Sequence, residues 1–356
     1  MGNADSQARF VQLALCRILD ANLDRAREGL RTIEEWCRFG LDNAVLTDEC
    51  KQLRQELAHW HTPTLRAARD TPGDAGTVLT HSQEAERSSV QAVLQANLCR
   101  VQEALRVLEE YGKVYSPNMG AACKQMRYRV YTLESQLTAD QRQQRLARSS
   151  LYLVTSPTEN LFATVEAALK GGLTLMQYRD KTADDEVRLR NAQTLSQLCR
   201  QYGALFIVND RVDLAIAVDA DGVHLGQQDI PIALARQLLG SQRLIGRSTH
   251  CPDDLHRALD EGADYIGVGP VYETPTKAGR PAAGFDYVRY AATHATVPWF
   301  AIGGIDTSNL SDVLAANVER VAIVRAIMHA DQPTLTTQYL LSQLSQQRSL
   351  GTAHDR

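Results

Sequence analysis

The chain has 356 residues and a mass of 39.4 kDa, more than one average domain, and 44% of its residues are hydrophobic. A formal net charge of −4 and a pI near 6.2 lack the basic excess typical of proteins that bind nucleic acids or anionic membranes. Seven scattered cysteines without a Cys-x-x-Cys pair argue against a disulfide framework or a zinc site. With no membrane-length apolar run and no signal peptide at the N-terminus, the sequence predicts a two-domain cytoplasmic protein that binds neither nucleic acid nor membrane.

The first part of the chain has the periodicity of an amphipathic helix, from Phe10 to about Gly40. The apolar stripe consists of Leu23, Ala26, Leu30, Ile33 and Cys37. Charged residues occupy the opposite side, at the spacing of ion pairs on a solvated helix face.

The helical pattern is repeated. Residues Ala21–Trp36 and Ala96–Tyr111 agree at nine of sixteen positions, and the related segments Cys50–Arg54 and Cys123–Arg127 follow them. A duplicated helical hairpin packs most simply as a bundle. The Pro- and Gly-containing segment 69–77 between the copies is predicted to be a loop.

The last helix of this bundle is expected to continue past Tyr128 toward Leu146, which gives a helical domain at 1–140 and a second domain at 141–356. Polar residues flank the apolar stripe in both copies: Asn22, Arg25, Asn97 and Arg100. They could converge on an anionic ligand, but polar residues beside a helix stripe are usually structural, so no function is predicted for the helical domain.

Short apolar segments alternate with amphipathic ones after residue 149. The predicted strands are Leu151–Thr155, Thr174–Tyr178, Leu205–Asp210, Gly222–Leu225, Arg243–Arg247, Tyr265–Val268, Trp299–Ile302 and Arg320–Val324. Eight such units in strict alternation favour a (β/α)8 TIM barrel over a doubly wound open sheet. In a barrel, functional residues belong at the C-terminal ends of the strands.

The strand Leu205–Asp210 illustrates this expectation, because four apolar residues lead directly into Asn209 and Asp210. An isolated Asn-Asp pair would usually be a helix cap. Here polar or glycine-rich residues follow one predicted strand after another, which favours a ligand site at the rim of the barrel.

The side chains at these strand ends suit phosphate and magnesium. Arg179, Lys181 and Lys277 are cations that can bind phosphate oxygens. Asp210 and Asp229 on neighbouring loops suit one Mg²⁺ that also takes phosphate and water oxygens. Two phosphorylated ligands, one of them a diphosphate that leaves during the reaction, are therefore expected.

A backbone phosphate site is expected at Gly303–Gly304 and at the start of the helix after Val324. The second domain also contains a series of motifs in order along the chain: 177–181 (QYRDK), 208–210 (VND), 222–229 (GVHLGQQD), 246–250 (GRSTH), 267–277 (GVGPVYETPTK) and 301–305 (AIGGI). With these motifs, the segment from Leu151 to about Met328 resembles thiamine-phosphate synthase. The helical extension resembles that of cyanobacterial members of this family.

The resemblance implies that a hydroxymethylpyrimidine diphosphate loses pyrophosphate and is captured by the ring nitrogen of a thiazole phosphate. It assigns the pyrimidine diphosphate to Gln177, Tyr178, Arg179, Asp180, Lys181, Asn209, Ser248 and Lys277, with Arg179, Lys181, Ser248 and Lys277 as catalytic residues. It assigns the thiazole phosphate to Thr274, Pro275, Thr276, Gly304, Val324 and Arg325, and one Mg²⁺ to Asp210 and Asp229. Arg325 departs from the small hydroxyl residue of many members, although its cation can serve a phosphate.

Two alternatives remain open. A thiazole tautomerase of the same barrel type would bind a thiazole carboxylate phosphate but would not need the diphosphate and metal residues. A regulatory binding module, with the helical domain as its docking part, would not need intact catalytic positions. His224 and His250 are interpreted as structural or supporting residues, and a homo-oligomer is possible.

Overall fold

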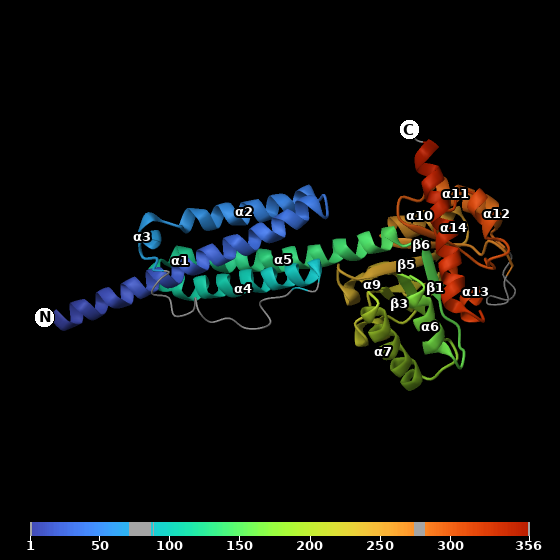
Figure 1. Cartoon of the computed structure of the whole chain (residues 1–356), viewed down its shortest axis with the longest axis horizontal. Coiled ribbons are helices and arrows are strands. Elements are labelled where there is room, and N and C mark those ends of the chain that lie inside the picture. Colours follow the sequence, from blue (N-terminus) through green and yellow to red (C-terminus); the bar gives the residue numbers. More distant parts are fainter. Residues whose placement is uncertain (1, 71–86, 88, 274–281, 355–356) are drawn as a thin grey trace. The chain divides into compact units, whose positions relative to one another are not determined.

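The computed structural model describes residues 2–70, 87, 89–273 and 282–354. The chain divides into two compact units, a helical unit (Met1–Thr138) and a barrel unit (Ala139–Arg356). Figure 1 shows helices alone in the first and a sheet surrounded by helices in the second. Among the described residues, no helix combines the length and the apolar character needed to cross a bilayer.

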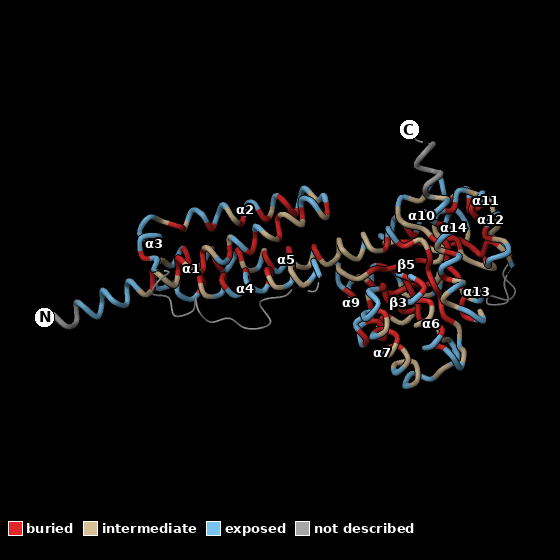
Figure 2. Tube along the Cα trace, viewed as in Figure 1, coloured by how far each residue is buried: buried red, intermediate tan, exposed pale blue. Residues whose placement is uncertain are grey.

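The helical unit is built from long helices whose apolar faces meet. They are α1 (Gly2–Phe39), α2 (Ala44–Trp60), α3 (Pro63–Ala67), α4 (Val90–Tyr115) and α5 (Pro117–Arg148), the last of which continues into the barrel unit. The predicted stripe of α1 is confirmed: its five residues from Leu23 to Cys37 are fully buried. Figure 2 shows the buried positions on the faces that the helices turn toward one another. Of the predicted loop 69–77, residues 71–77 lie outside the described part of the chain.

The two copies of the hairpin share the same buried ion pair. In the first copy Arg54 donates to Glu34, and in the second Arg127 Nε donates to Glu109 Oε2 at 2.9 Å. Both glutamates are almost completely buried. Burial raises the pKa of Glu109, but the hydrogen bond and charge of Arg127 outweigh this and hold it below its ordinary value. The repeated sequence therefore records a repeated packing contact.

The polar residues beside the stripe also have structural roles. Asn22 Nδ2 donates to the carbonyl of Ile18, and Asn97 Nδ2 donates to the carbonyl of Val93, both at 2.8 Å. Each amide thus satisfies a carbonyl of its own helix, at equivalent places in the two copies.

The second unit is a closed parallel barrel, as predicted. Its strands are β1 (Leu151–Val154), β2 (Leu175–Tyr178), β3 (Leu205–Asn209), β4 (Gly222–Leu225), β5 (Leu244–Thr249), β6 (Tyr265–Val268), β7 (Trp299–Ile302) and β8 (Val321–Ile323). Each strand pairs with the next, and β1 pairs with β8 to complete the ring.

Several strands begin or end one or two residues away from the prediction, and the differences at the ends of β5 and β3 affect the site. β5 continues through Ser248 and Thr249, which look like loop residues in sequence but pair with Gly267 and Val268 of β6. β3 ends at Asn209, because Asp210 has a φ of 61° in the left-handed region, where an extended strand cannot continue.

Helices cover the outside of the barrel. They are α6 (Leu161–Lys170), α7 (Asp185–Gln201), α8 (Val212–Ala217), α9 (Ile232–Leu239), α10 (Pro252–Asp260), α11 (Gly284–His294), α12 (Leu310–Ala315), α13 (Arg325–Met328) and α14 (Pro333–His354). The end of α5 closes the N-terminal end of the barrel: Leu146 packs with the interior residues, and Arg142 Nε donates to Asp221 just before β4 at 2.8 Å. The C-terminal end is left for a ligand site.

Side chains alternate between the interior and the helix layer along each strand. The interior cluster includes Tyr152, Leu205, Ile207, Tyr265 and Phe300. Their neighbours in sequence, such as Phe206 and Ile266, pack against the helices. Of two neighbouring residues on a strand, only the one whose side chain faces the interior can therefore reach the site.

Replacing Glu109 with alanine tests the duplicated ion pair. The substitution removes a buried carboxylate and leaves the partly buried guanidinium of Arg127 without it, so we expect the free energy of unfolding of the helical unit to fall by about 3 kcal/mol. Hydrogen exchange followed by mass spectrometry reads the two units separately, and only peptides of the helical unit should lose protection.

Glu110→Ala is the matched control. Glu110 is exposed and pairs with Arg106 and Lys113 on the surface, so its loss should cost less than about 1 kcal/mol. Equal losses in both variants would show that the buried pair does not stabilise the bundle.

Candidate active site

Two adjoining cavities open among the C-terminal ends of the strands. The apolar cavity, of about 340 Å³, is lined by interior residues that include Tyr152, Val154, Phe300 and Ile302. The charged cavity, of about 300 Å³, is lined by residues that include Lys181, Asp210, Gln228 and Asp229. The two share Arg179, Asn209, Ser248 and His250. They are therefore two compartments of one site.

The predicted acidic pair lies in the charged cavity. Lys181 Nζ forms an ion pair with Asp210 Oδ2 at 3.0 Å, and Asp229 Oδ2 accepts a hydrogen bond from the backbone of Gly226 at 2.6 Å. Burial raises the pKa of Asp210, but hydrogen bonds with Lys181 and Asp229 leave it below its ordinary value. Burial and the neighbouring Asp210 raise the pKa of Asp229 despite the Gly226 hydrogen bond. Each carboxylate therefore affects the pKa of the other, and the charge of Lys181 acts on both.

The backbone fixes Asp210 in this place. Its left-handed φ turns the chain at the end of β3, and its amide donates to the carbonyl of His224 on β4 at 2.9 Å. Aspartate tolerates this conformation better than most residues, so the turn can aim a carboxylate at the cavity.

The loop after β2 carries two of the predicted cations. The backbone amide of Arg179 donates to Thr155 Oγ1 at 2.9 Å, which ties the start of the loop to the segment after β1. Asp180 Oδ1 accepts hydrogen bonds from the amides of Thr182 and Ala183 and from the Thr182 hydroxyl, at 2.9 to 3.0 Å. The side chain of Asp180 therefore orders the loop that presents Arg179 and Lys181.

Tyr178 lies on the other face of β2. It is almost fully buried in the layer between strands and helices, and its hydroxyl contacts Asn191 Nδ2 at 3.4 Å. The cavity-lining residues that the structure describes do not include it. The geometry gives Tyr178 a packing position, because it alternates with the inward-facing Gln177.

Gln177 and Ser248 line the apolar cavity from β2 and β5. Gln177 Nε2 donates to the hydroxyl of Tyr152 at 2.6 Å, and Ser248 Oγ lies 2.9 Å from His224 Nε2. Sequence reasoning did not single out Tyr152 or Phe300. Their places at alternate positions of β1 and β7 could have indicated inward-facing side chains.

A glycine turn and the start of α13 line the other side of the apolar cavity. Gly303 and Gly304 have positive φ values of 107° and 69°, and a Cβ on Gly303 would lie 2.4 Å from Pro270 Cβ. Val324 and Arg325 follow β8 and line the same cavity. Thr274, Pro275, Thr276 and Lys277, which the sequence assigned to the site, lie outside the described residues.

Comparison with known proteins agrees with this geometry. Residues 151–327 match the family model described as thiamine monophosphate synthase. The thiamine-phosphate synthase of Nostoc punctiforme is 71% identical, over 96% of this chain and 97% of its own, and that of Synechocystis is 68% identical, over 93% and 97%. The chain belongs to the thiamine-phosphate synthase family.

A solved structure supports the same grouping for the barrel. The thiamine phosphate pyrophosphorylase from Pyrococcus furiosus is 35% identical with a TM-score of 0.52, and the match covers 58% of this chain and 98% of that one. Almost the whole of that protein is therefore covered by little more than half of this chain. Residues 17–136, in the helical unit, match the model of the ThiD2 family.

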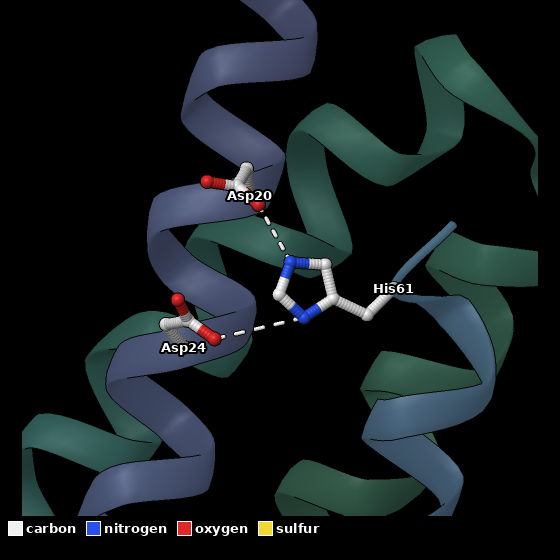
Figure 3. Close-up of side chains that lie close together, drawn as sticks. All are labelled: Asp20, Asp24 and His61. Carbon is white, nitrogen blue, oxygen red and sulfur yellow. Dashed lines mark hydrogen bonds and ion pairs between the residues drawn. The ribbon is translucent and has the colours of Figure 1, made fainter. Parts of the chain in front are cut away.

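The helical unit of this synthase family member contains a second group of potential metal ligands, shown in Figure 3. His61 Nε2 lies 2.6 Å from Asp20 Oδ1, and His61 Nδ1 lies 3.6 Å from Asp24 Oδ1. Arg69 forms ion pairs with both carboxylates, and Arg27 with Asp24. Because cations already match the carboxylates, the group is accounted for as an ion-pair network that ties α1 to the segment around α3.

The loop role of Asp180 can be tested directly. Asp180→Ala removes the acceptor for the amides of Thr182 and Ala183, and loss of such a cap costs about 1 kcal/mol, so exchange of these amide hydrogens should accelerate about fivefold. Asp180→Asn keeps an acceptor oxygen and should exchange nearly as the unsubstituted protein does. If the asparagine and alanine variants were equally fast, the cap would not be what orders the loop.

Proposed function

We propose that the barrel unit joins a hydroxymethylpyrimidine diphosphate to a thiazole phosphate, which yields thiamine phosphate and pyrophosphate. The observation that carries this proposal is the direct connection between an apolar cavity sized for small rings and a cavity that holds both cations and paired carboxylates. Family membership supports it, since the relatives named above carry the name of this activity.

In this proposal the diphosphate occupies the charged cavity. Arg179 can offer two parallel donors and Lys181 a point charge to its oxygens. Asn209 lines both cavities, which supports placing the bond between the diphosphate and the pyrimidine methylene beside it. Gln177 and Ser248 contact the ring in the apolar cavity. Lys277 is a further phosphate ligand on the strength of the sequence resemblance alone.

The thiazole phosphate is placed on the opposite side of the apolar cavity. The glycine turn at Gly303–Gly304 can approach an anion closely because it lacks side chains, and Arg325 brings a positive charge to the same side. Thr274, Pro275 and Thr276 join this set by the resemblance. In this chain the positive charge of Arg325 would attract the thiazole phosphate, where a hydroxyl residue would donate a hydrogen bond to it.

The chemistry needs little from a general base. The bond between the methylene carbon and the diphosphate oxygen breaks, and its electron pair leaves with pyrophosphate. The electron-rich aminopyrimidine stabilises the positive charge on the methylene, and the lone pair of the thiazole nitrogen forms the new bond. The protein neutralises the growing charge on the leaving group and holds the two rings in line.

Asp210 and Asp229 fit one Mg²⁺. Both offer hard oxygen donors, and one or two carboxylates together with substrate phosphate oxygens is the usual set for this ion. Bound there, Mg²⁺ would offset negative charge on the departing diphosphate. The pKa of Asp210 lies below its ordinary value, so this carboxylate stays charged and able to bind a cation at neutral and mildly acidic pH.

The two alternatives account for fewer of these features. A tautomerase would leave the cation and carboxylate set of the charged cavity without a role. A binding module would not need carboxylates poised beside Lys181. We place the activity in the barrel unit, because all the proposed site residues lie between Gln177 and Arg325.

The direct test is mass spectrometry of the full-length protein incubated with Mg²⁺, the pyrimidine diphosphate and the thiazole phosphate. We expect thiamine phosphate and pyrophosphate to form together, and EDTA to stop their formation. Absence of product from a folded protein with ample Mg²⁺ would reject the proposed function and favour one of the alternatives.

Asp210→Asn tests the metal assignment. Losing one of two protein carboxylates should raise the Mg²⁺ concentration needed for half-maximal rate by about tenfold or more, equivalent to at least ~1.4 kcal/mol of metal binding. Initial rates measured across a Mg²⁺ titration give this value.

Asp213→Asn is the control for this measurement. Asp213 is an exposed aspartate in the same segment of chain and pairs with Arg211 on the surface. Its Mg²⁺ titration should match that of the unsubstituted protein. If Asp210→Asn also matched, Asp210 would not be a metal ligand.

A further inference from the structure

A continuous hydrogen-bonded chain crosses the barrel interior at the wall of the apolar cavity, which Tyr152 and His224 help to line. Tyr152 on β1, Tyr265 on β6 and His224 on β4 form its middle, which we call the relay. Tyr152 and Tyr265 hydroxyls are 2.8 Å apart, and the Tyr265 hydroxyl lies 3.3 Å from His224 Nδ1. Gln177 contacts one end of the relay and Ser248 the other, at 2.6 and 2.9 Å. The relay thus connects two residues that line the cavity from different strands.

The barrel makes room for the relay with glycines. A Cβ on Gly246 would lie 2.2 Å from Tyr265 Cζ and 2.6 Å from His224 Nδ1, and one on Gly267 would lie 3.4 Å from His224 Cε1. Both glycines face inward on β5 and β6. The tyrosine rings and Phe300 pack edge to face in the same layer, which fixes the hydroxyls.

Each member of the relay can donate one hydrogen and accept another, so the direction of one bond sets the next. Gln177 Nε2 donates to Tyr152, and a chain that starts from this donor runs from Tyr152 to Tyr265 and from Tyr265 to His224 Nδ1, two contacts in which either partner is able to donate. In the same direction His224 Nε2 is the donor to Ser248, which leaves the hydroxyl hydrogen of Ser248 for a ligand. Burial raises the pKa of both tyrosines, so both remain neutral donors.

The two ends are therefore complementary. With its nitrogen engaged, Gln177 presents its carboxamide oxygen to the cavity as an acceptor, while Ser248 presents a donor. An aminopyrimidine offers the matching pattern, because its amino group donates and the adjacent ring nitrogen accepts. The counterpart with an oxo group in place of the amino group has the reversed pattern.

We propose that the relay positions the two end residues as a coupled acceptor and donor, and thereby selects an aminopyrimidine over its oxo counterpart. The inference rests on the proposed function for the class of ligand. Tyr152, Tyr265 and His224 are positioning residues in this scheme, since they act through Gln177 and Ser248. Breaking any link frees each end to reorient independently, which weakens the discrimination without emptying the site.

The test measures binding rather than turnover. Calorimetry on the full-length protein with Mg²⁺, without the thiazole partner, gives the dissociation constants of the aminopyrimidine diphosphate and of its oxo counterpart. In Tyr265→Phe we expect the ratio of the two constants to shrink by about tenfold, the size of one to two net hydrogen bonds. Tyr152→Phe should do the same, and the double variant should lose no more than either single one.

Tyr287→Phe is the matched control. Tyr287 is also buried in the barrel unit and donates to Thr249 Oγ1 at 2.6 Å, but it lies outside the relay. In this variant the ratio of the two dissociation constants should stay unchanged. Gly246→Ala, which displaces Tyr265 or His224 and removes no polar group, should reproduce the tyrosine variants.

The results separate this inference from the proposed function. Unchanged discrimination in Tyr265→Phe and Gly246→Ala, or an unsubstituted protein that does not discriminate, would overturn the relay. Additive losses in the double variant would also overturn it, because independent contacts add whereas links of one chain do not. A protein that discriminates by way of the relay but forms no thiamine phosphate would instead contradict the proposed function.

Discussion

Closure of the sheet between β1 and β8 is the constraint on which the site depends. Parallel strands in a closed ring all end at the same mouth, so residues from distant parts of the sequence face one space. Gln177 and Ser248 are 71 positions apart along the chain, yet both line the apolar cavity. An open sheet would bring together the ends of neighbouring strands only. The ring therefore allows the barrel to hold a leaving diphosphate and two rings in adjoining compartments.

Sequence patterns could predict the strands and the residues at their ends, since apolar runs that stop at charged residues are visible without coordinates. Asp210 and Lys181 were found in this way, and they do meet. The meeting of Tyr152 with Tyr265 could not be predicted, because it depends on how the tilt and register of the closed barrel align inward positions across the interior. Periodicity shows which side of a strand a residue faces, and it does not show which partner it will find there.

Neighbouring residues of one motif can also have different structural roles. Gln177 faces the cavity, Tyr178 packs against the helix layer, and Asp180 caps its own loop. All three belong to the motif that carries the family resemblance, and each is explained by a different physical requirement. A motif therefore identifies a site more reliably than it identifies the residues that touch a ligand.

The two copies of the hairpin in the helical unit keep one polar contact unchanged and vary another. The pair of Arg54 with Glu34 recurs in the second copy, where loss of Arg127 would leave the buried charge of Glu109 unmatched. At the positions corresponding to Asp20 and His61, the second copy has Gln95 and Glu134, and these two also contact each other, at 3.3 Å. The second copy therefore keeps a polar contact at these positions, but the carboxylate and the imidazole are replaced by an amide and a carboxylate. The first contact keeps its buried glutamate in both copies, whereas the second is buried at Asp20 and His61 but has an exposed Gln95 in the second copy, where only a hydrogen bond is retained.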